Sequence, residues 1–265
     1  MAVELSGART LLTGATGGIG RVIARRLAAE GADLTLTGRR SDVLDELAAE
    51  LGARAIRADL AESADVERLI AASGEIDVLV ACAGLPGSGR FTTLRQTDVD
   101  RALAVNLHAP LALAHAFAPA MVSRRYGHLL FIGSLSARAA SFGASVYCAS
   151  KFGLRGFALS LRAELAGSGV GVSIVQPGFV SDVGLYADTA ISLPPGAGTR
   201  PPEDVADAVV RAIERNRGEV TVAAFTLAAG AQIAGVAPGF AAWANRLLGG
   251  ERIALQFEER QADKR

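Results

Sequence analysis

This sequence has no net charge and no cysteine cluster, and its first residues lack the pattern of a secretory leader. It has 27 Lys and Arg residues against 27 Asp and Glu residues, scattered along the sequence, so nothing favours nucleic acid as a partner. Its two cysteines, Cys82 and Cys148, have neither the spacing of a metal site nor that of a disulfide framework. The N-terminus lacks a basic region followed by an apolar run. We therefore expect a cytoplasmic protein with no metal site.

Linkers and internal repeats are also absent, and this predicts a single domain over residues 1–265. With 265 residues, 50% of them hydrophobic, the chain has ample material for one buried core. The Pro- and Gly-rich segment Leu193 to Pro202 is typical of a loop, and a helix is predicted after it over Glu203 to Arg215. Residues 220–265 are expected to form a C-terminal extension of this domain.

Two stretches contain almost no charge. Ala102 to Ser123 has only His108 and His115 as titratable residues, which favours a helix at a subunit interface in a homodimer or homotetramer.

Val220 to Asn245 has no charged residue, but Pro238 interrupts it and it is rich in Ala and Gly. We expect a last strand and a substrate-side or interface helix there. Peripheral contact with a membrane is the alternative, and a membrane span is disfavoured.

Short apolar runs alternate with segments of helical periodicity from residue 8 onward. This alternation predicts repeated βα units, and therefore an α/β, doubly wound, Rossmann-like parallel sheet with helices on both faces. The segments with helical spacing include 21–30, 43–51 and 66–72. Six runs are predicted strands: Arg9 to Leu12, Asp33 to Thr37, Ala53 to Ala58, Ile76 to Ala81, Gly127 to Ile132 and Gly171 to Val175.

A glycine-rich turn, Thr13-Gly14-Ala15-Thr16-Gly17-Gly18-Ile19-Gly20, lies between the first predicted strand and the first predicted helix. Glycine permits close approaches that a Cβ would block, and the helix N-terminus offers free N–H groups to a pyrophosphate. The strand before and the helix after strengthen this interpretation. A glycine turn without a ligand is the alternative. The predicted dinucleotide contacts are Gly14, Thr16, Gly18, Ile19 and Gly20.

The second strand ends in Thr37-Gly38-Arg39-Arg40. Folds that bind NAD place an acidic residue here for the ribose 2′-hydroxyl, whereas arginine accommodates the 2′-phosphate of NADP. We therefore predict NADP(H) rather than NAD(H), with Arg39 and Arg40 at the phosphate, unless both arginines merely begin a solvated helix. Asp59 and Leu60, after the third strand, could contact the adenine, although Asp59 fits an N-cap nearly as well.

The chain has only two Lys residues, at 151 and 264, and Lys151 stands four residues after Tyr147. Positions i and i+4 share one face of a helix, so an ammonium would lie beside a phenol and lower its pKa toward the working range of a general acid/base. Ser134, at the end of a predicted strand, could donate to a carbonyl oxygen. Asn106 is an amide in an apolar helix and needs partners. Taken singly, Asn106 and Ser134 could equally be a core residue and a turn residue.

Together these motifs resemble the short-chain dehydrogenase/reductase family. The resemblance covers about residues 5–222 and rests on Thr13-Gly14-x-x-x-Gly18-Ile19-Gly20, Asn106, Ser134, Tyr147-x-x-x-Lys151 and Gln176-Pro177-Gly178. It implies a sheet of about seven parallel strands. It also implies an oxidoreductase that transfers a hydride between C4 of NADP(H) and a carbonyl or secondary-alcohol carbon.

The resemblance also implies a role for each motif residue. Tyr147 gives or takes the proton, Ser134 orients the substrate oxygen, and Asn106 positions a water in the proton relay. Lys151 holds the nicotinamide ribose and lowers the pKa of Tyr147. Besides Asn106, Tyr147 and Lys151, the family pattern implies coenzyme contacts at Ala83, Gly84, Pro177, Gly178 and Val180.

Two positions depart from the family pattern. After the fourth strand the family commonly has Asn-Asn-Ala-Gly, whereas this chain has Ala81-Cys82-Ala83-Gly84, so the bracing at the centre of the sheet is an open question. Near position 182 the family often has a Thr that contacts the coenzyme, whereas this chain has Ser181 and Asp182. A carboxylate beside phosphates is unfavourable, so either Ser181 replaces the Thr or Asp182 points away.

The substrate is expected to be a hydrophobic ketone or alcohol, because the segment after Pro177-Gly178 that would cover it is mostly apolar. Two other function classes stay open: a dinucleotide-binding sensor or scaffold with little turnover, and a membrane-surface lipid-binding protein. All four family residues are present, which favours the enzyme. The candidate pocket residues are Phe179, Val183, Leu185, Tyr186 and Ile191, with Ala139, Phe142 and Phe240 as further candidates.

Overall fold

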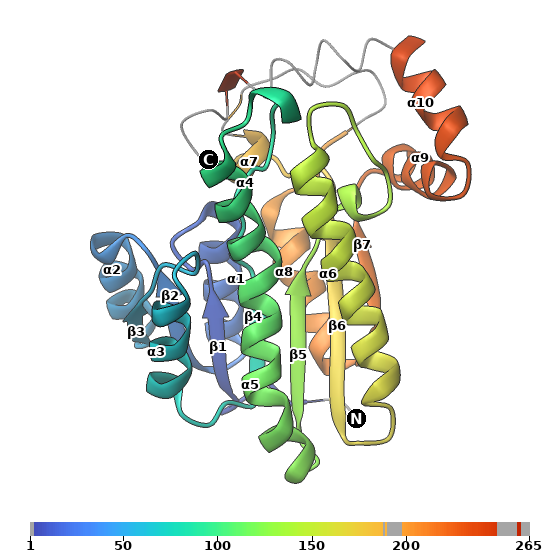
Figure 1. The fold of residues 1–265 in the computed structure, drawn as a ribbon. Coiled ribbons are helices and arrows are strands. Elements are labelled where there is room, and N and C mark those ends of the chain that lie inside the picture. Colours follow the sequence, from blue (N-terminus) through green and yellow to red (C-terminus); the bar gives the residue numbers. More distant parts are fainter. Residues whose placement is uncertain (1–2, 188, 190–197, 248–258, 261–265) are drawn as a thin grey trace.

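One parallel sheet forms the centre of the protein (Figure 1). The computed structural model describes residues 3–187, 189, 198–247 and 259–260, with side chains for all of these except 244–247. The sheet has seven strands in the order β3-β2-β1-β4-β5-β6-β7, and every neighbouring pair is parallel, which confirms the predicted doubly wound α/β fold. The strands are β1 Arg9–Thr13, β2 Asp33–Gly38, β3 Arg54–Arg57, β4 Val78–Ala81, β5 Gly127–Ile132, β6 Val170–Pro177 and β7 Glu219–Val222.

Helices cover both faces of this sheet because its central strands are apolar on both sides. Leu12 and Val80 belong to one buried cluster, whereas Leu11 and Leu79, their neighbours along the strands, belong to the other. The first cluster is closed by α1 Gly18–Ala29, α2 Ser41–Leu51 and α8 Pro202–Glu214. The second cluster is closed by α3 Ser63–Ser73, α5 Ala109–Ser123 and α6 Ser145–Glu164, which lie in front of the sheet in Figure 1.

The strand order reverses between β1 and β4, and in open α/β sheets ligands bind at the carboxyl ends of the strands at such a point. The connections at this edge contain the 3₁₀ helices Phe91–Thr93 and Leu135–Ala137 and the short helices α4 Gln96–Leu103 and α7 Gly184–Ala187. After β7 the chain forms α9 Phe225–Val236 and α10 Pro238–Leu247 at the same end of the molecule (Figure 1). The expected last strand and following helix are therefore present.

The charge-poor stretch Ala102 to Ser123 lies mainly in α5. Gln96–Ser123 is long and apolar enough to cross a membrane by length and composition alone, the only such helix among the described residues. However, Leu113, Phe117 and Met121 pack into the second buried cluster against the sheet. This helix therefore forms part of the core. The expected subunit interface on its other face stays a prediction.

The loop predicted over Leu193 to Pro202 lies partly outside the described residues, since 193–197 are not described. The helix predicted after it is present as α8, with Pro202 at its first turn and Glu203 and Asp204 close behind. Proline tolerates this position because its missing N–H would be unpaired there in any case, and acidic side chains complement the helix dipole.

Candidate active site

The glycine turn, the Cys82–Gly84 segment, Ser134 and Pro177 follow or end β1, β4, β5 and β6 respectively. Because these strands are parallel neighbours, their carboxyl ends meet at one edge of the sheet. The sequence-predicted coenzyme and catalytic residues therefore converge at the point where the strand order reverses.

The glycine turn fits closely against neighbouring backbone. Gly14 has a φ of +72°, and a Cβ there would lie 2.7 Å from the Cα of Ala83. A Cβ on Gly20 would lie 2.1 Å from the carbonyl oxygen of Gly14. Helix α1 begins at Gly18, so its first N–H groups point out of the helix end with no partner inside it. This cradle of backbone donors fits a pyrophosphate.

The hydroxyl of Thr13 braces the centre of the sheet. Its Oγ accepts hydrogen bonds from the N–H groups of Cys82 at 3.1 Å and Ala83 at 3.2 Å, and so ties β1 to the end of β4. Burial raises the pKa of the Cys82 thiol to about 12, so the thiol is protonated and a poor nucleophile at neutral pH. The hydroxyl of Thr13 on the neighbouring β1 therefore supplies the bracing beside Cys82 that the sequence left open.

Asn106 lies in a π-helical turn, Ala104–His108, between α4 and α5. Its Oδ1 accepts from the N–H of Leu85 at 2.7 Å, and its Nδ2 donates to the carbonyl of Leu85 at 2.9 Å and to Oγ of Ser150 at 3.3 Å. The fully buried amide is thus satisfied by the loop after β4 and by α6. Asn106 joins these two parts of the site, as π-turns often do at functional sites.

Tyr147 and Ser134 are within hydrogen-bonding contact. Ser134 caps the 3₁₀ helix Leu135–Ala137, where its Oγ accepts from the N–H of Ser136 at 3.1 Å. Burial raises the pKa of the Tyr147 phenol above its ordinary value of 10.0, and the hydrogen bond with Ser134 opposes that shift. The direction is opposite to the lowered pKa expected from the sequence, because desolvation of the phenolate is the largest influence on this group.

Lys151 lies one turn along α6 from Tyr147, and only 4% of it is exposed. Its Nζ donates to the carbonyl oxygen of Ile132 at 2.9 Å and lies 5.8 Å from the centroid of the Tyr147 ring. Burial lowers the pKa of Lys151 to about 8. A Cβ on Gly84 would lie 3.8 Å from this Nζ and 3.6 Å from Oδ1 of Asn106. Gly84 is exposed, so a ligand that contacts it would lie beside both groups.

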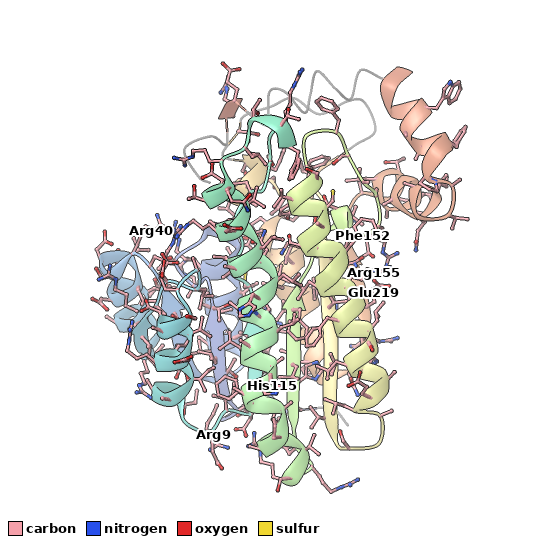
Figure 2. All side chains as sticks on the ribbon, in the orientation of Figure 1. Arg9, Arg40, His115, Phe152, Arg155 and Glu219 are labelled. Atoms are coloured by element: carbon pink, nitrogen blue, oxygen red, sulfur yellow. The ribbon has the colours of Figure 1, made fainter. Side chains whose placement is uncertain are left out.

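A partly buried ion network that includes Arg138, shortly after Ser134, gave no recognisable signal in the sequence. Arg138, which ends the 3₁₀ helix after Ser134, pairs with Glu219 at 2.6 Å and donates through Nε to Oε1 of Gln176 at 2.7 Å. Arg155 of α6 pairs with the same Glu219 at 2.6 Å, and Figure 2 shows these two side chains together. The network therefore fixes the loop after Ser134 to β6, β7 and α6.

The predicted 2′-phosphate site is a hollow of about 330 Å³ at the ends of β2 and β3. Its lining side chains are Arg39, Arg57, Asp59, Asp65 and Arg68.

The other residues predicted near this hollow have different surroundings. The Arg40 guanidinium donates to the carbonyl oxygen of Thr16, so it contacts the glycine turn. Asp59 pairs with Arg101 at 2.7 Å, and its Oδ1 accepts from the N–H of Ala61 at 3.0 Å. The side chain of Leu60 packs in the core, which leaves its backbone as the group that could contact an adenine.

The segment after Gly178 folds back over the glycine turn. Val180 forms a bridge with Arg200, and a Cβ on Gly18 would lie 2.6 Å from Cβ of Val183. Asp182 is exposed and has a φ of +63°. The hydroxyl of Ser181 lies 3.5 Å from the carbonyl oxygen of Arg200, and both alternatives for this position stay predictions.

Apolar side chains from several segments lie around Gly178, which follows β6. The rings of Phe179 and Tyr186 lie 5.0 Å apart. A Cβ on Gly178 would lie 3.0 Å from Leu227 of α9 and 3.3 Å from Leu135, so α9 borders the site. Ile191 lies outside the described residues. The large exposed apolar residues at this end include Phe142, Phe225, Ile233, Val236, Phe240 and Trp243.

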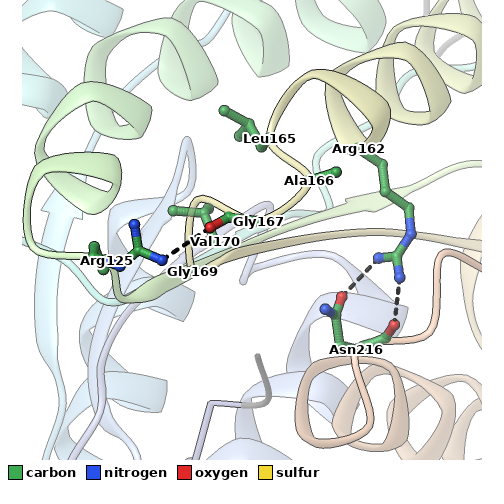
Figure 3. A pocket seen from close by; sticks show the side chains of 8 residues that line it. All are labelled: Arg125, Arg162, Leu165, Ala166, Gly167, Gly169, Val170 and Asn216. Atoms are coloured by element: carbon green, nitrogen blue, oxygen red, sulfur yellow. Dashed lines mark hydrogen bonds between the residues drawn. The ribbon is translucent and has the colours of Figure 1, made fainter.

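A second hollow, of about 400 Å³, lies at the opposite edge of the sheet (Figure 3). Its two arginines are already engaged by the protein: Arg125 donates to the carbonyl of Gly167 at 3.0 Å, and Arg162 donates to Oδ1 of Asn216 at 2.6 Å. None of the predicted site residues lines it. These arginines connect surface segments, so this hollow is no candidate for the active site.

Comparison with known proteins agrees with this geometry. Residues 8–189 match the family described as short chain dehydrogenase. The chain is 37% identical to the ketoacyl reductase HetN of Nostoc sp. over 227 residues, 82% of this chain and 79% of that protein. It is 32% identical to the 3-oxoacyl-[acyl-carrier-protein] reductase FabG of Rickettsia conorii over 180 residues, 67% of this chain and 75% of that protein. Among solved structures it is similar to a short-chain dehydrogenase from Sphingobium yanoikuyae in complex with NADPH, with a TM-score of 0.76, 30% identity and coverage of 88% of this chain and 94% of that chain.

Proposed function

The chain belongs to the short-chain dehydrogenase family of oxidoreductases, and we propose that it transfers a hydride between NADP(H) and a carbonyl or secondary alcohol. The observation that carries this proposal is the meeting of Tyr147, Ser134 and Lys151 beside the exposed Gly84. A phenol, a hydroxyl and an ammonium at one strand edge supply a proton donor, an orienting group and a positive charge.

NADP(H) fits the groups along this edge. The backbone donors at the start of α1 would hold the pyrophosphate, and the hollow beside Arg39 would hold the 2′-phosphate. Lys151, next to Gly84, would donate to the ribose at the reactive end of the coenzyme. The bound coenzyme supplies or accepts the hydride at its nicotinamide. The protein's own contribution is to hold the carbonyl and to move one proton.

Tyr147 is the group that moves this proton at its phenolic oxygen. Burial keeps the phenol protonated at neutral pH, which is the state needed to donate to a carbonyl oxygen that gains negative charge. Ser134, in contact with Tyr147, would hydrogen-bond the same carbonyl oxygen and orient it. The ammonium of Lys151 is the nearby charge that favours the phenolate left behind.

The substrate proposed here is a hydrophobic ketone of the 3-oxoacyl class. HetN and FabG are named as reductases of ketoacyl compounds. Apolar surface for an acyl chain would come from the residues around Gly178, which are Leu135 next to Ser134, Leu227 of α9 and the Phe179–Tyr186 pair.

Coenzyme oxidation across a panel of ketones tests this proposal. The panel should contain 3-oxoacyl thioesters of increasing chain length, simple aliphatic ketones and polar hydroxyketones, each assayed with NADPH and with NADH. We expect turnover with NADPH that rises with acyl-chain length. Turnover confined to the polar ketones would contradict the substrate class, and no turnover with any carbonyl would contradict the reaction.

A further inference from the structure

The hollow at the ends of β2 and β3 contains an arginine that the sequence motifs do not assign. Arg57 is the last residue of β3, and its register partner on β2 is Gly38, the residue before Arg39. Because β2 and β3 are adjacent parallel strands, Arg57 and Arg39 both lie at the carboxyl ends of these strands. Both line the hollow.

The two carboxylates of the hollow form ion pairs with other arginines. Asp65 pairs with Arg68 at 2.8 Å, and Asp59 pairs with Arg101 at 2.7 Å. Within the described part of the chain, neither Arg39 nor Arg57 forms an ion pair with a carboxylate. The lining of the hollow has more positive than negative groups, with Arg39, Arg57 and Arg68 against Asp59 and Asp65, and this excess favours a phosphate monoester with a charge of about −1.5 to −2.

The backbone positions the Arg57 guanidinium for such a ligand. Its Nε donates to the carbonyl oxygen of Arg39 at 3.2 Å, and this contact holds the side chain at the hollow that it lines. Arg40, by contrast, donates to the carbonyl of Thr16 and is engaged with the glycine turn. The second arginine available at the hollow is therefore Arg57 from β3 and not Arg40 from the β2 connection.

We propose that Arg57 and Arg39 together bind the 2′-phosphate of NADP(H), and that Arg57 is a specificity-determining residue of this enzyme. The inference rests on the proposed function. It extends that function by assigning coenzyme choice to the end of β3 as well as to the end of β2. A bidentate guanidinium contact with phosphate is charge-assisted and directional, so its loss should affect NADPH far more than NADH.

Dissociation constants of NADPH and NADH for the purified full-length protein test this proposal. For Arg57→Gln we expect NADPH binding to weaken by about tenfold or more, because one charge-assisted contact is lost, while NADH binding changes by less than about twofold. Arg54→Gln is the matched control, since Arg54 begins the same strand and is exposed at the other edge. This control should leave the ratio of the two constants unchanged.

The two proposals fail in different ways. If the wild-type protein binds NADPH and NADH equally, the coenzyme choice itself is wrong. If the wild type prefers NADPH and Arg57→Gln keeps that preference, only the role of Arg57 is wrong. Unchanged affinity of Arg57→Gln for NADH shows that this variant is folded. The Arg57→Lys variant tests the contribution of the Arg57 guanidinium independently. We expect Arg57→Lys to retain part of the salt-sensitive attraction to NADPH but to lose affinity relative to the wild type.

Discussion

The ammonium of Lys151 lies 5.8 Å from the ring centroid of Tyr147 and donates to the carbonyl oxygen of Ile132 at 2.9 Å. The Lys side chain is thus held by the end of β5 and does not hang freely beside the phenol. This anchoring explains why the position needs a compact ammonium with several donors. One N–H group donates to the protein backbone, and the other two can donate to a ligand.

Replacement of Lys151 by Arg should abolish turnover although the charge is kept. Lys151 is 4% exposed and its Nζ lies close to Gly84, so the larger planar guanidinium cannot occupy the same position. We expect kcat to fall by about 100-fold or more. Steady-state kinetics with NADPH checks this, and retained activity in Lys151→Arg would show that charge alone suffices.

The stability of the coenzyme-free protein should rise with pH relative to a Lys151→Met variant. Burial lowers the pKa of Lys151 to about 8 in the folded protein, against 10.5 for an ordinary Lys. Between these values the unfolded chain binds more protons than the folded one, so a rise in pH stabilises the fold. From pH 7 to 9.5 the free energy of unfolding should increase by about 2 kcal/mol relative to the variant. Urea titrations at several pH values measure it; parallel pH profiles for the two proteins would contradict the burial of a charged Lys151.

Replacement of Glu219 by Gln should destabilise the protein and slow the reaction. Burial raises the pKa of Glu219, but the hydrogen bond from Arg155 and the charges of Arg138 and Arg155 outweigh it and hold the pKa below its usual value. The variant leaves the buried Arg138 without its carboxylate, at an expected loss of about 2–3 kcal/mol. A lowered carboxyl pKa stabilises the folded protein at pH values above the ordinary pKa of a carboxyl group. The difference in free energy of unfolding between the wild type and Glu219→Gln should therefore shrink as the pH falls toward 3.

The control for Glu219→Gln is Glu50→Gln. Glu50 pairs with Arg25 at 2.7 Å, but both side chains are largely exposed, so its removal should change stability little. The Glu219 variant should also lower kcat, since Arg138 ends the 3₁₀ helix that Ser134 begins. Equal effects of the two substitutions on urea midpoint and on kcat would show that the network does not hold the Ser134 loop.

Replacement of Gly14 by Ala should remove coenzyme binding. The new Cβ would lie 2.7 Å from the backbone of Ala83, so the glycine turn and the end of β4 would be forced apart. Gly52 offers a matched control, because it also has a positive φ but nothing lies within 4 Å of its Cβ position. Gly52→Ala should lose about 1–2 kcal/mol of stability and bind NADPH normally. Similar NADPH affinities for the two variants would mean that the close packing of Gly14 is unimportant.

The fold and most of the site were predictable because each depends on local patterns. Alternating apolar runs and helical segments predict the parallel sheet, and the strand–glycine–helix order predicts the phosphate turn. Side chains that meet only through the tertiary fold were not predictable. Nothing in the sequence brings Arg138 to Glu219, and only the register of β2 and β3 shows that Arg57 stands beside Arg39. The pKa of Tyr147 was also misjudged, because spacing indicates a charged neighbour but not the burial that opposes it.

Turnover of the Tyr147→Phe variant tests the central claim most directly. The substitution removes the phenolic oxygen and keeps the ring that packs beside Lys151. We expect NADPH-dependent ketone reduction to fall by at least about 100-fold, the size of a lost general acid, while the dissociation constant of NADPH changes by less than about twofold. Undiminished turnover in Tyr147→Phe would contradict the account, because the proton would then come from another group.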